Sequence, residues 1–233
     1  NLDMKNVCIK AFTDNVPSVE KSRILQAVEE IERENLAEGD YTASSWADFA
    51  AAKYAAIDVY QSENPSERGI ANAVTALMAA GNALKRAVIL IEGADAFEAF
   101  ARDVSSGNSY GEQTVRLLCD LDLTGIVHKA AGDSNSKFQG TFDGGGHSIS
   151  NLSYQYIYSW GGLFGYVGEN GTVKDVKLSD AGLALGASHS GGIAGVNEGT
   201  ISGCEVTGES LRFTFGGTGG IAGVNRGTIS GCM

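Results

Sequence analysis

The chain has 233 residues, of which 43% are hydrophobic, and a formal net charge of −11 at pH 7. Nucleic acids are bound by basic surfaces, so we expect no nucleic-acid partner for this acidic chain. No apolar run approaches the ~20 residues of a membrane-spanning helix, so we expect no membrane insertion in this stretch. Only 3 of the 32 glycines precede Gly93, and this imbalance predicts two regions of different structure.

The glycine-poor region contains three stretches whose apolar residues recur at helical spacing. These stretches cover residues 19–35, 42–61 and 64–85. In the third, Asn64 would cap the helix, with Pro65 at the first helical position and Glu67 three residues after the cap. Short polar turns between the helices predict an up-down-up three-helix bundle over residues 18–86. Residues 1–17 would be a leader or the end of a preceding module.

The same spacing predicts which side chains the bundle buries. The expected core residues are Ile24, Leu25, Val28, Ile31, Trp46, Phe49, Ala50, Tyr54, Ile57, Tyr60, Ile70, Val74, Leu77 and Leu84. Trp46 would suit stacking on a sugar ring, but at this spacing we expect it in the core.

The words "DYTASSW" and the Ala-rich helices after them resemble the FIVAR module, from about Val19 to Arg86. The matching residues are Tyr41, Thr42, Ser45 and Trp46. The resemblance implies a small three-helix bundle that is repeated in bacterial cell-surface proteins as a sugar-binding or spacer module.

The glycine-rich region contains a repeated sequence motif. "GGIAGVNEGTISGC" (residues 191–204) recurs 28 residues later as "GGIAGVNRGTISGC" (219–232), and only Glu198 becomes Arg226. A degenerate copy, "GGLFGYVGENGTVKDV", covers residues 161–176. Repeats of this length indicate a solenoid, because each unit buries its apolar face only against the next.

The repeat is too short to form a sheet unless successive copies pair with one another at a spacing of about 4.8 Å. Identical side chains would then form ladders. The predicted pairs are Ile193 with Ile221, Ile201 with Ile229, Cys204 with Cys232, and Asn197 with Asn225. Glu198 and Arg226 would form a salt bridge at a solvent-facing turn, worth roughly 0–1 kcal/mol.

The words "GGLFGYV", "GGIAGVN" and "GTISGC" resemble the GLUG motif of large bacterial surface proteins, including adhesins and immunoglobulin A peptidases. With the upstream words "AFEAFARDV" and "FQGTFDGGGHSISNL", the resemblance runs from about Val88 to Met233. It implies a right-handed parallel β-helix over residues 87–233, with the "AFEAFARDV" helix covering its N-terminal end. We therefore expect a multidomain α plus β fragment, with the solenoid truncated at its C-terminus.

Few residues indicate a zinc site or a catalytic site. The four cysteines show no CxxC spacing, which argues against zinc, and we expect Cys119 in the core. Asp143 and His147 would suit an acid and a base, but in "DGGGH" we expect Asp143 to accept backbone N–H groups. The carboxyl groups of Asp120 and Asp122 would lie about 7 Å apart on one strand face, a separation found in glycosidases. We expect no catalytic residues.

Metal sites are equally weakly indicated. His128 and His189 have no partner at metal-ligand spacing, and we expect both in surface loops. Asp120, Asp122 and Asp133 would offer oxygen ligands to calcium, but no calcium signature is present. We expect no cofactor and no metal.

The segment "NLSYQYIYSW" alternates aromatic and other residues. In an extended chain, four aromatic side chains would share one face: Tyr154, Tyr156, Tyr158 and Trp160. Such a face would bind a sugar or a partner, or would pack against another part of the molecule.

Together these features predict a non-catalytic module of a secreted bacterial protein at the cell wall or cell surface. It would serve adhesion and projection and bind carbohydrate or a host glycoprotein, and we expect a monomer. The alternative is an enzyme: a β-helix polysaccharide-cleaving enzyme, or the accessory region of a surface peptidase whose catalytic domain lies elsewhere.

Overall fold

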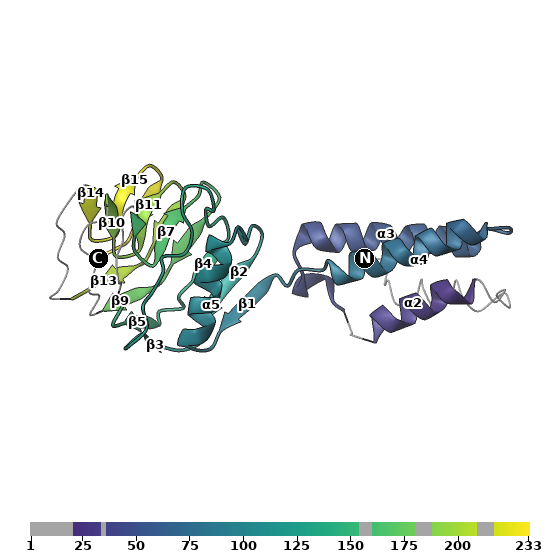
Figure 1. Ribbon diagram of the computed structural model, residues 1–233, viewed down its shortest axis with the longest axis horizontal. Coiled ribbons are helices and arrows are strands. Elements are labelled where there is room, and N and C mark those ends of the chain that lie inside the picture. The colour runs from purple at the N-terminus through teal and green to yellow at the C-terminus, as the bar shows by residue number, and fades with distance from the viewer. Residues whose placement is uncertain (1–20, 34–35, 154–159, 180–187, 209–216) are drawn as a thin grey trace. The chain divides into compact units, whose positions relative to one another are not determined.

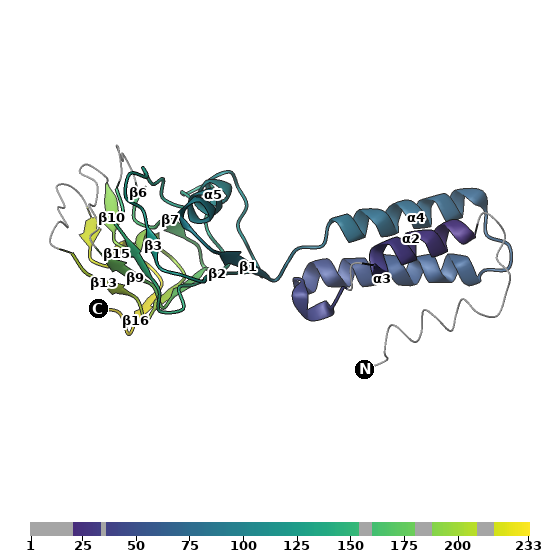
Figure 2. The same cartoon turned by 90° about the horizontal axis from the view of Figure 1, so that it is seen from below.

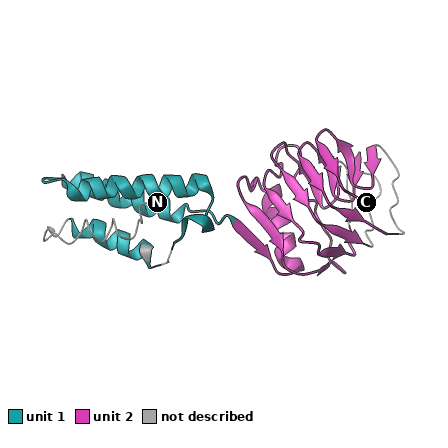
Figure 3. Ribbon diagram, turned by 180° about the vertical axis from the view of Figure 1, so that it is seen from behind, with its two compact units in different colours: residues 1–87 teal, residues 88–233 magenta. Residues whose placement is uncertain are grey.

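The computed structural model describes residues 21–33, 36–153, 160–179, 188–208 and 217–233. The chain forms two compact units, residues 1–87 and residues 88–233 (Figure 3). Within the described residues, no helix has the length and apolar character needed to cross a membrane.

The first unit is the expected three-helix bundle (Figures 1 and 2). Its elements are α2 (Ser22–Glu32), the short 3-10 helix η1 (Glu38–Asp40), α3 (Ala43–Gln61) and α4 (Glu67–Asn82). Lys21 Nζ donates to Ser62 O at 2.5 Å, which places the start of α2 beside the end of α3. Thr42 N donates to Lys85 O at 2.8 Å, which places the start of α3 beside the end of α4. The helices therefore run up, down and up.

The core of this bundle confirms most of the predicted residues and corrects one. Ile24, Phe49, Ile70 and Leu77 are all at most 3% exposed. Trp46 is half-buried and packs between Tyr41 and Phe49, with ring centroids 6.0 and 5.5 Å away. The prediction for Tyr54 was wrong, because its side chain is 52% exposed.

The error at Tyr54 follows from helix geometry. The buried positions of α3 are Phe49, Lys53, Ala56, Ile57 and Tyr60, which are spaced three or four residues apart. Tyr54 directly follows Lys53 and therefore points about 100° away from this stripe.

The N-cap of α4 is also different from the prediction. Ser66, not Asn64, precedes the first helical residue, and its Oγ accepts from Gly69 N at 3.1 Å. A capping oxygen must reach the free N–H groups of the first turn, and Ser66 has the extended backbone (φ −70°, ψ 149°) that allows it. Glu67 is consequently the first helical residue.

The second unit is a parallel β-solenoid of about four turns (Figure 1). Its strands are β1 (Val88–Ile91), β2 (Thr114–Leu117), β3 (Leu121–Asp122), β4 (Thr141–Asp143), β5 (Ser148–Ser150), β6 (Trp160–Gly161), β7 (Phe164–Val167), β8 (Thr172–Lys174), β9 (Lys177–Ser179), β10 (His189–Gly191), β11 (Ala194–Asn197), β12 (Thr200–Ser202), β13 (Glu205–Val206), β14 (Gly217–Gly219), β15 (Ala222–Asn225) and β16 (Thr228–Ser230). These short strands are stabilised by their neighbours in the turns before and after, as the repeat predicts.

The strands pair into four parallel sheets that run along the stack. The largest has the order β1-β2-β4-β8-β12-β16, and the second has the order β3-β5-β9-β13. The other two are β6-β10-β14 and β7-β11-β15. Consecutive members of each sheet therefore come from successive turns, which is the topology of a solenoid.

The predicted ladders are confirmed in register. Ile201 pairs with Ile229, and Ile193 N donates to Ile221 O at 3.0 Å. Asn197 Nδ2 donates to Asn225 Oδ1 at 2.7 Å. Copies 28 residues apart thus lie directly over one another.

Close backbone approach explains the glycine after each turn tip. A Cβ atom at Gly199 would collide with the carbonyl oxygens of Gly171 and Gly168 in the preceding turn. A Cβ atom at Gly227 would collide with the carbonyl oxygen of Gly199 in the same way. Only glycine allows the turns to stack at this corner.

Helix α5 (Ala94–Ser105) lies between β1 and β2 in the chain and packs on the solenoid core (Figure 2). Phe97 and Phe100 are at most 3% exposed. The Phe100 ring contacts those of Phe138, Phe142 and Phe164, at centroid distances of 5.5 to 6.1 Å. An aromatic cluster therefore joins this helix to the first turns.

Candidate functional surfaces of the solenoid

The "DGGGH" corner holds Asp143 as a structural carboxylate. Its Oδ1 accepts from Gly145 N at 3.0 Å, as predicted. Its Oδ2 pairs with Arg116 at 3.1 Å and with Lys174 at 3.2 Å. Burial alone would raise the pKa of Asp143, but these hydrogen bonds and the two cations outweigh it and lower the pKa. An ionised, fully engaged carboxylate is poorly suited to act as a general acid.

The other candidate acid–base residues also form hydrogen bonds with nearby residues. Asp120 Oδ1 accepts from Ser148 N at 2.8 Å and lies 3.3 Å from His147 Nδ1. Asp122 Oδ1 accepts from Thr124 Oγ1 at 2.7 Å. Hydrogen bonds from Ser148 and from Thr124 lower the pKa of Asp120 and of Asp122, respectively. These carboxylates fasten loops to neighbouring strands.

The three aspartates considered as calcium ligands, Asp120, Asp122 and Asp133, are not gathered into one site. Asp133 Oδ1 accepts from Asn135 N at 2.8 Å and from Ser136 N at 3.0 Å, which closes its own turn. Within the described part of the chain, no group of three or more His, Cys, Asp or Glu residues is arranged to hold a metal ion.

The prediction for His128 was wrong. Its side chain is buried, with Nδ1 2.5 Å from Glu98 Oε1 and Nε2 3.1 Å from Leu163 O. Its ring also stacks on Phe97 of α5, with centroids 5.4 Å apart. His128 therefore connects α5 to the solenoid, and its partners lie 30 and 35 residues away, where local sequence spacing gives no signal.

His189 was likewise expected in a surface loop, but it lies in strand β10. It is half-buried and pairs in register with Trp160 of β6. The ladder therefore continues through both residues.

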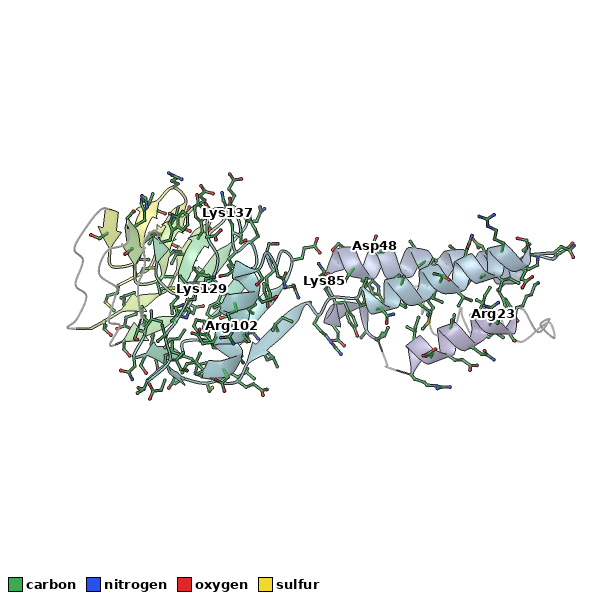
Figure 4. The ribbon with its side chains drawn as sticks, viewed as in Figure 1. Arg23, Asp48, Lys85, Arg102, Lys129 and Lys137 are labelled. Atoms are coloured by element: carbon green, nitrogen blue, oxygen red, sulfur yellow. The ribbon has the colours of Figure 1, made fainter. Side chains whose placement is uncertain are left out.

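The variable position of the repeat forms a larger network than the predicted pair. We name Lys137, Tyr166, Glu198 and Arg226 the Glu198 cluster. Glu198 Oε1 accepts from Tyr166 Oη at 2.5 Å and from Arg226 at 3.3 Å. Glu198 Oε2 accepts from Lys137 Nζ at 2.7 Å (Lys137 is labelled in Figure 4).

Glu198 is thus more enclosed than a solvent-facing turn would be. Its side chain is only 16% exposed, whereas that of Arg226 is 63% exposed. Hydrogen bonds from Lys137, then from Tyr166, lower the pKa of Glu198. The repeat predicts that Glu198 pairs with Arg226. Lys137 and Tyr166 belong to earlier turns with different sequences, so the repeat does not predict their contacts with Glu198.

The outward face of the six-stranded sheet carries a ladder that the sequence analysis missed. Five threonines stack in register at the first position of successive strands: Thr114, Thr141, Thr172, Thr200 and Thr228. Their side chains are half-buried or exposed, whereas the next position in each strand points into the core. The recurring pair of a threonine and a following apolar residue in each turn was the available signal.

The aromatic segment is described only at its ends. Leu152 is fully buried, and Trp160 is half-buried at the start of β6, beside Gly195. Tyr154, Tyr156 and Tyr158 lie outside the described residues. An outward-facing aromatic row therefore stays a prediction.

Comparison with known proteins gives one weak similarity. No family model matches the chain, and no solved structure matches it. Over 118 residues the chain is 28% identical to halomucin of the archaeon Haloquadratum walsbyi. The alignment covers 45% of this chain and 1% of halomucin, so the chain spans a very small part of that protein. The FIVAR and GLUG resemblances stay predictions, whereas the helical bundle and the parallel β-solenoid are established by the structure.

Proposed function

We propose that this chain is a non-catalytic module of a secreted cell-surface protein that serves projection and adhesion. The similarity to halomucin, a cell-surface protein, supports a surface location. Halomucin is archaeal, so an origin in a bacterial cell wall rests on the FIVAR and GLUG resemblances alone.

The in-register stacking of the turns is the observation that carries this proposal. The turns that carry β6–β9 and β10–β13 contribute a strand to all four sheets, and the stacked turns share one continuous core. Adding a turn lengthens the stack by about 4.8 Å without requiring a new fold. Such a stack suits a spacer that holds a binding surface away from a cell.

Carbohydrate, free or on a host glycoprotein, is the ligand class that we propose. The aromatic segment with Tyr154, Tyr156, Tyr158 and Trp160 would stack on sugar rings, because aromatic faces pack against the apolar faces of sugars. The threonine ladder would supply hydroxyl groups on the outward face of the six-stranded sheet. Asp143 is already paired with Arg116 and Lys174, which supports carbohydrate binding without cleavage.

A glycan array tests this proposal. We expect the chain to bind a subset of glycans and the Tyr154/Tyr156/Tyr158→Ala variant to lose at least tenfold in affinity. Tyr54→Ala is the matched control, because Tyr54 is an exposed tyrosine of the helical unit and its loss should leave binding unchanged. An empty array for the wild type, or equal binding by the wild type and the triple variant, would reject carbohydrate recognition by this segment.

The enzyme alternative is tested separately. If the chain releases reducing or unsaturated ends from polysaccharides and Asp143→Ala abolishes that release, the module is catalytic and our proposal is wrong. We expect no release by either protein.

A further inference from the structure

Two cysteine thiols lie one above the other at a corner of the solenoid, and the proposed function does not use them. Cys204 and Cys232 directly follow Gly203 and Gly231, whose φ angles are 62° and 60°. The backbone joins the two turns at this corner, since Met233 N donates to Cys204 O at 2.9 Å. The two residues are therefore equivalent members of one ladder.

Their sulfur atoms occupy equivalent positions. Sγ of Cys204 lies 3.4 Å from Ser202 O, and Sγ of Cys232 lies 3.4 Å from Ser230 O. Each sulfur also lies 3.8 or 3.9 Å from a carbonyl oxygen of the preceding turn. Successive turns are about 4.8 Å apart, which is within the roughly 4.4–6.8 Å between Cα atoms that a disulfide spans.

The two thiols differ in access. Cys204 is 1% exposed within the solenoid core, and burial raises the pKa of its thiol to about 12. Cys232 is half-buried in the last described turn. A dissolved oxidant therefore reaches Cys232 first.

We propose that Cys204 and Cys232 form a disulfide in an oxidising environment and so fasten their two turns together. The thiolate of Cys232 attacks a small-molecule disulfide, such as oxidised glutathione, which forms a mixed disulfide and releases one glutathione thiolate. Cys204 then loses its proton to solvent and attacks the Cys232 sulfur, which releases the second glutathione thiolate. The two protein sulfurs give up two electrons, and the small disulfide takes up those electrons with two protons.

Peptide mass spectrometry of the full chain tests this proposal. The protein is equilibrated in glutathione buffers of defined potential, alkylated and cleaved with trypsin after Lys177, Arg212 and Arg226. We expect a cross-linked pair of peptides, residues 178–212 with residues 227–233. Cys119, at the same corner of an earlier turn, is the internal control and should stay fully alkylated.

A thermal measurement accompanies it. Oxidation should raise the unfolding temperature of the solenoid by about 5 °C or more, because the bridge closes a 28-residue loop. Cys232→Val should abolish this rise while the protein stays folded, because Val176 already occupies the equivalent corner of an earlier turn (Glu205 pairs with Lys177).

The proposal would be overturned if both thiols stayed fully alkylable in oxidised glutathione. It would also be overturned if either were linked to Cys119 or Cys8 instead. Because the buffer supplies the oxidant, neither result depends on where the protein is located.

Discussion

The helical unit and the solenoid are stabilised by contacts of opposite range. In the helical unit the cap of α4 joins residues three apart, Ser66 and Gly69. In the solenoid the Asn197–Asn225 bond joins residues 28 apart, and the Lys137–Glu198 pair joins residues 61 apart. A helix forms most of its hydrogen bonds within itself, whereas a solenoid strand depends on the next turn. Changes that crowd the backbone should therefore be tolerated in the first unit and not in the second.

The largest difference is expected from glycine-to-alanine changes. Gly199→Ala places a Cβ atom against carbonyl oxygens of the turn below, so we expect it to destabilise the solenoid by about 3 kcal/mol or more. Gly39→Ala in the helical unit meets nothing within 4 Å and should be neutral or slightly stabilising. Denaturant unfolding measures both.

Gly220→Ala is the control within the solenoid, because its Cβ atom would also meet nothing within 4 Å. If Gly199→Ala and Gly220→Ala had equal effects, close stacking at the turn tip would not be the reason for the glycine.

Truncation of core side chains should show that the two units unfold independently. Leu77→Ala removes a side chain that is 1% exposed in the bundle, and Ile201→Ala removes one that is 0% exposed in the solenoid. Each should cost about 2–4 kcal/mol. Because the two cores are distinct clusters, Leu77→Ala should lower only the helical transition and Ile201→Ala only the solenoid transition. Circular dichroism at helix and strand wavelengths distinguishes them, and a shared shift would contradict independent cores.

The Glu198 cluster should show a smaller, charge-dependent effect. Glu198→Gln should destabilise the solenoid by about 1–2 kcal/mol at pH 7, because it removes the charge that faces Lys137 and Arg226. The pKa of Glu198 is lowered in the folded state, so its contribution is present above the unfolded pKa and is lost as pH falls through the folded pKa. The difference between wild type and Glu198→Gln should therefore shrink on acidification below about pH 4.

Exchanging the charges of residues 198 and 226 tests whether Lys137 contributes to the stability of this cluster. In Glu198→Arg/Arg226→Glu the ladder pair is restored, but residue 198 then repels Lys137. We expect the swap to remain less stable than the wild type. Full recovery would mean that only the 28-residue ladder matters at this corner.

The smallest effect is expected at the helix cap. Ser66→Ala should destabilise the helical unit by about 1 kcal/mol, because it leaves Gly69 N without its side-chain acceptor. Asn64→Ala, at the position that the sequence first suggests as the cap, should have no measurable effect. Thermal unfolding of the two variants compares them, and the reverse order would restore the original assignment.

The sequence predicted contacts well where they follow a period. Helical spacing identified Ile24 and Leu77, because the pattern involves residues that are close in the sequence. The 28-residue repeat identified the Ile201–Ile229 pair, because the same motif occurs twice. It failed where a partner lies outside the pattern. His128 was misplaced because its partners lie far away in the sequence, Glu98 in α5 and Leu163 between β6 and β7. Tyr54 was misplaced because the buried stripe of α3 is set by both helices that pack against it.

The candidate binding surface was only partly predictable. The threonine ladder recurs once per turn and was overlooked, although the pairs around Thr172, Thr200 and Thr228 repeat at 28-residue intervals. The role of the aromatic segment depends on which way Tyr154, Tyr156 and Tyr158 face, and alternation alone leaves an outward and a packed orientation open.

Nuclear Overhauser effects between isoleucine methyl groups test the in-register stack most directly. In the folded chain we expect strong cross-peaks between Ile201 and Ile229 and between Ile193 and Ile221, because each pair lies on adjacent, hydrogen-bonded turns. Gly199→Ala should weaken these cross-peaks, and Gly39→Ala should leave them unchanged. Absence of both cross-peaks in well-folded wild-type protein would contradict the stacking of the repeats and, with it, the proposed role as a rigid surface spacer.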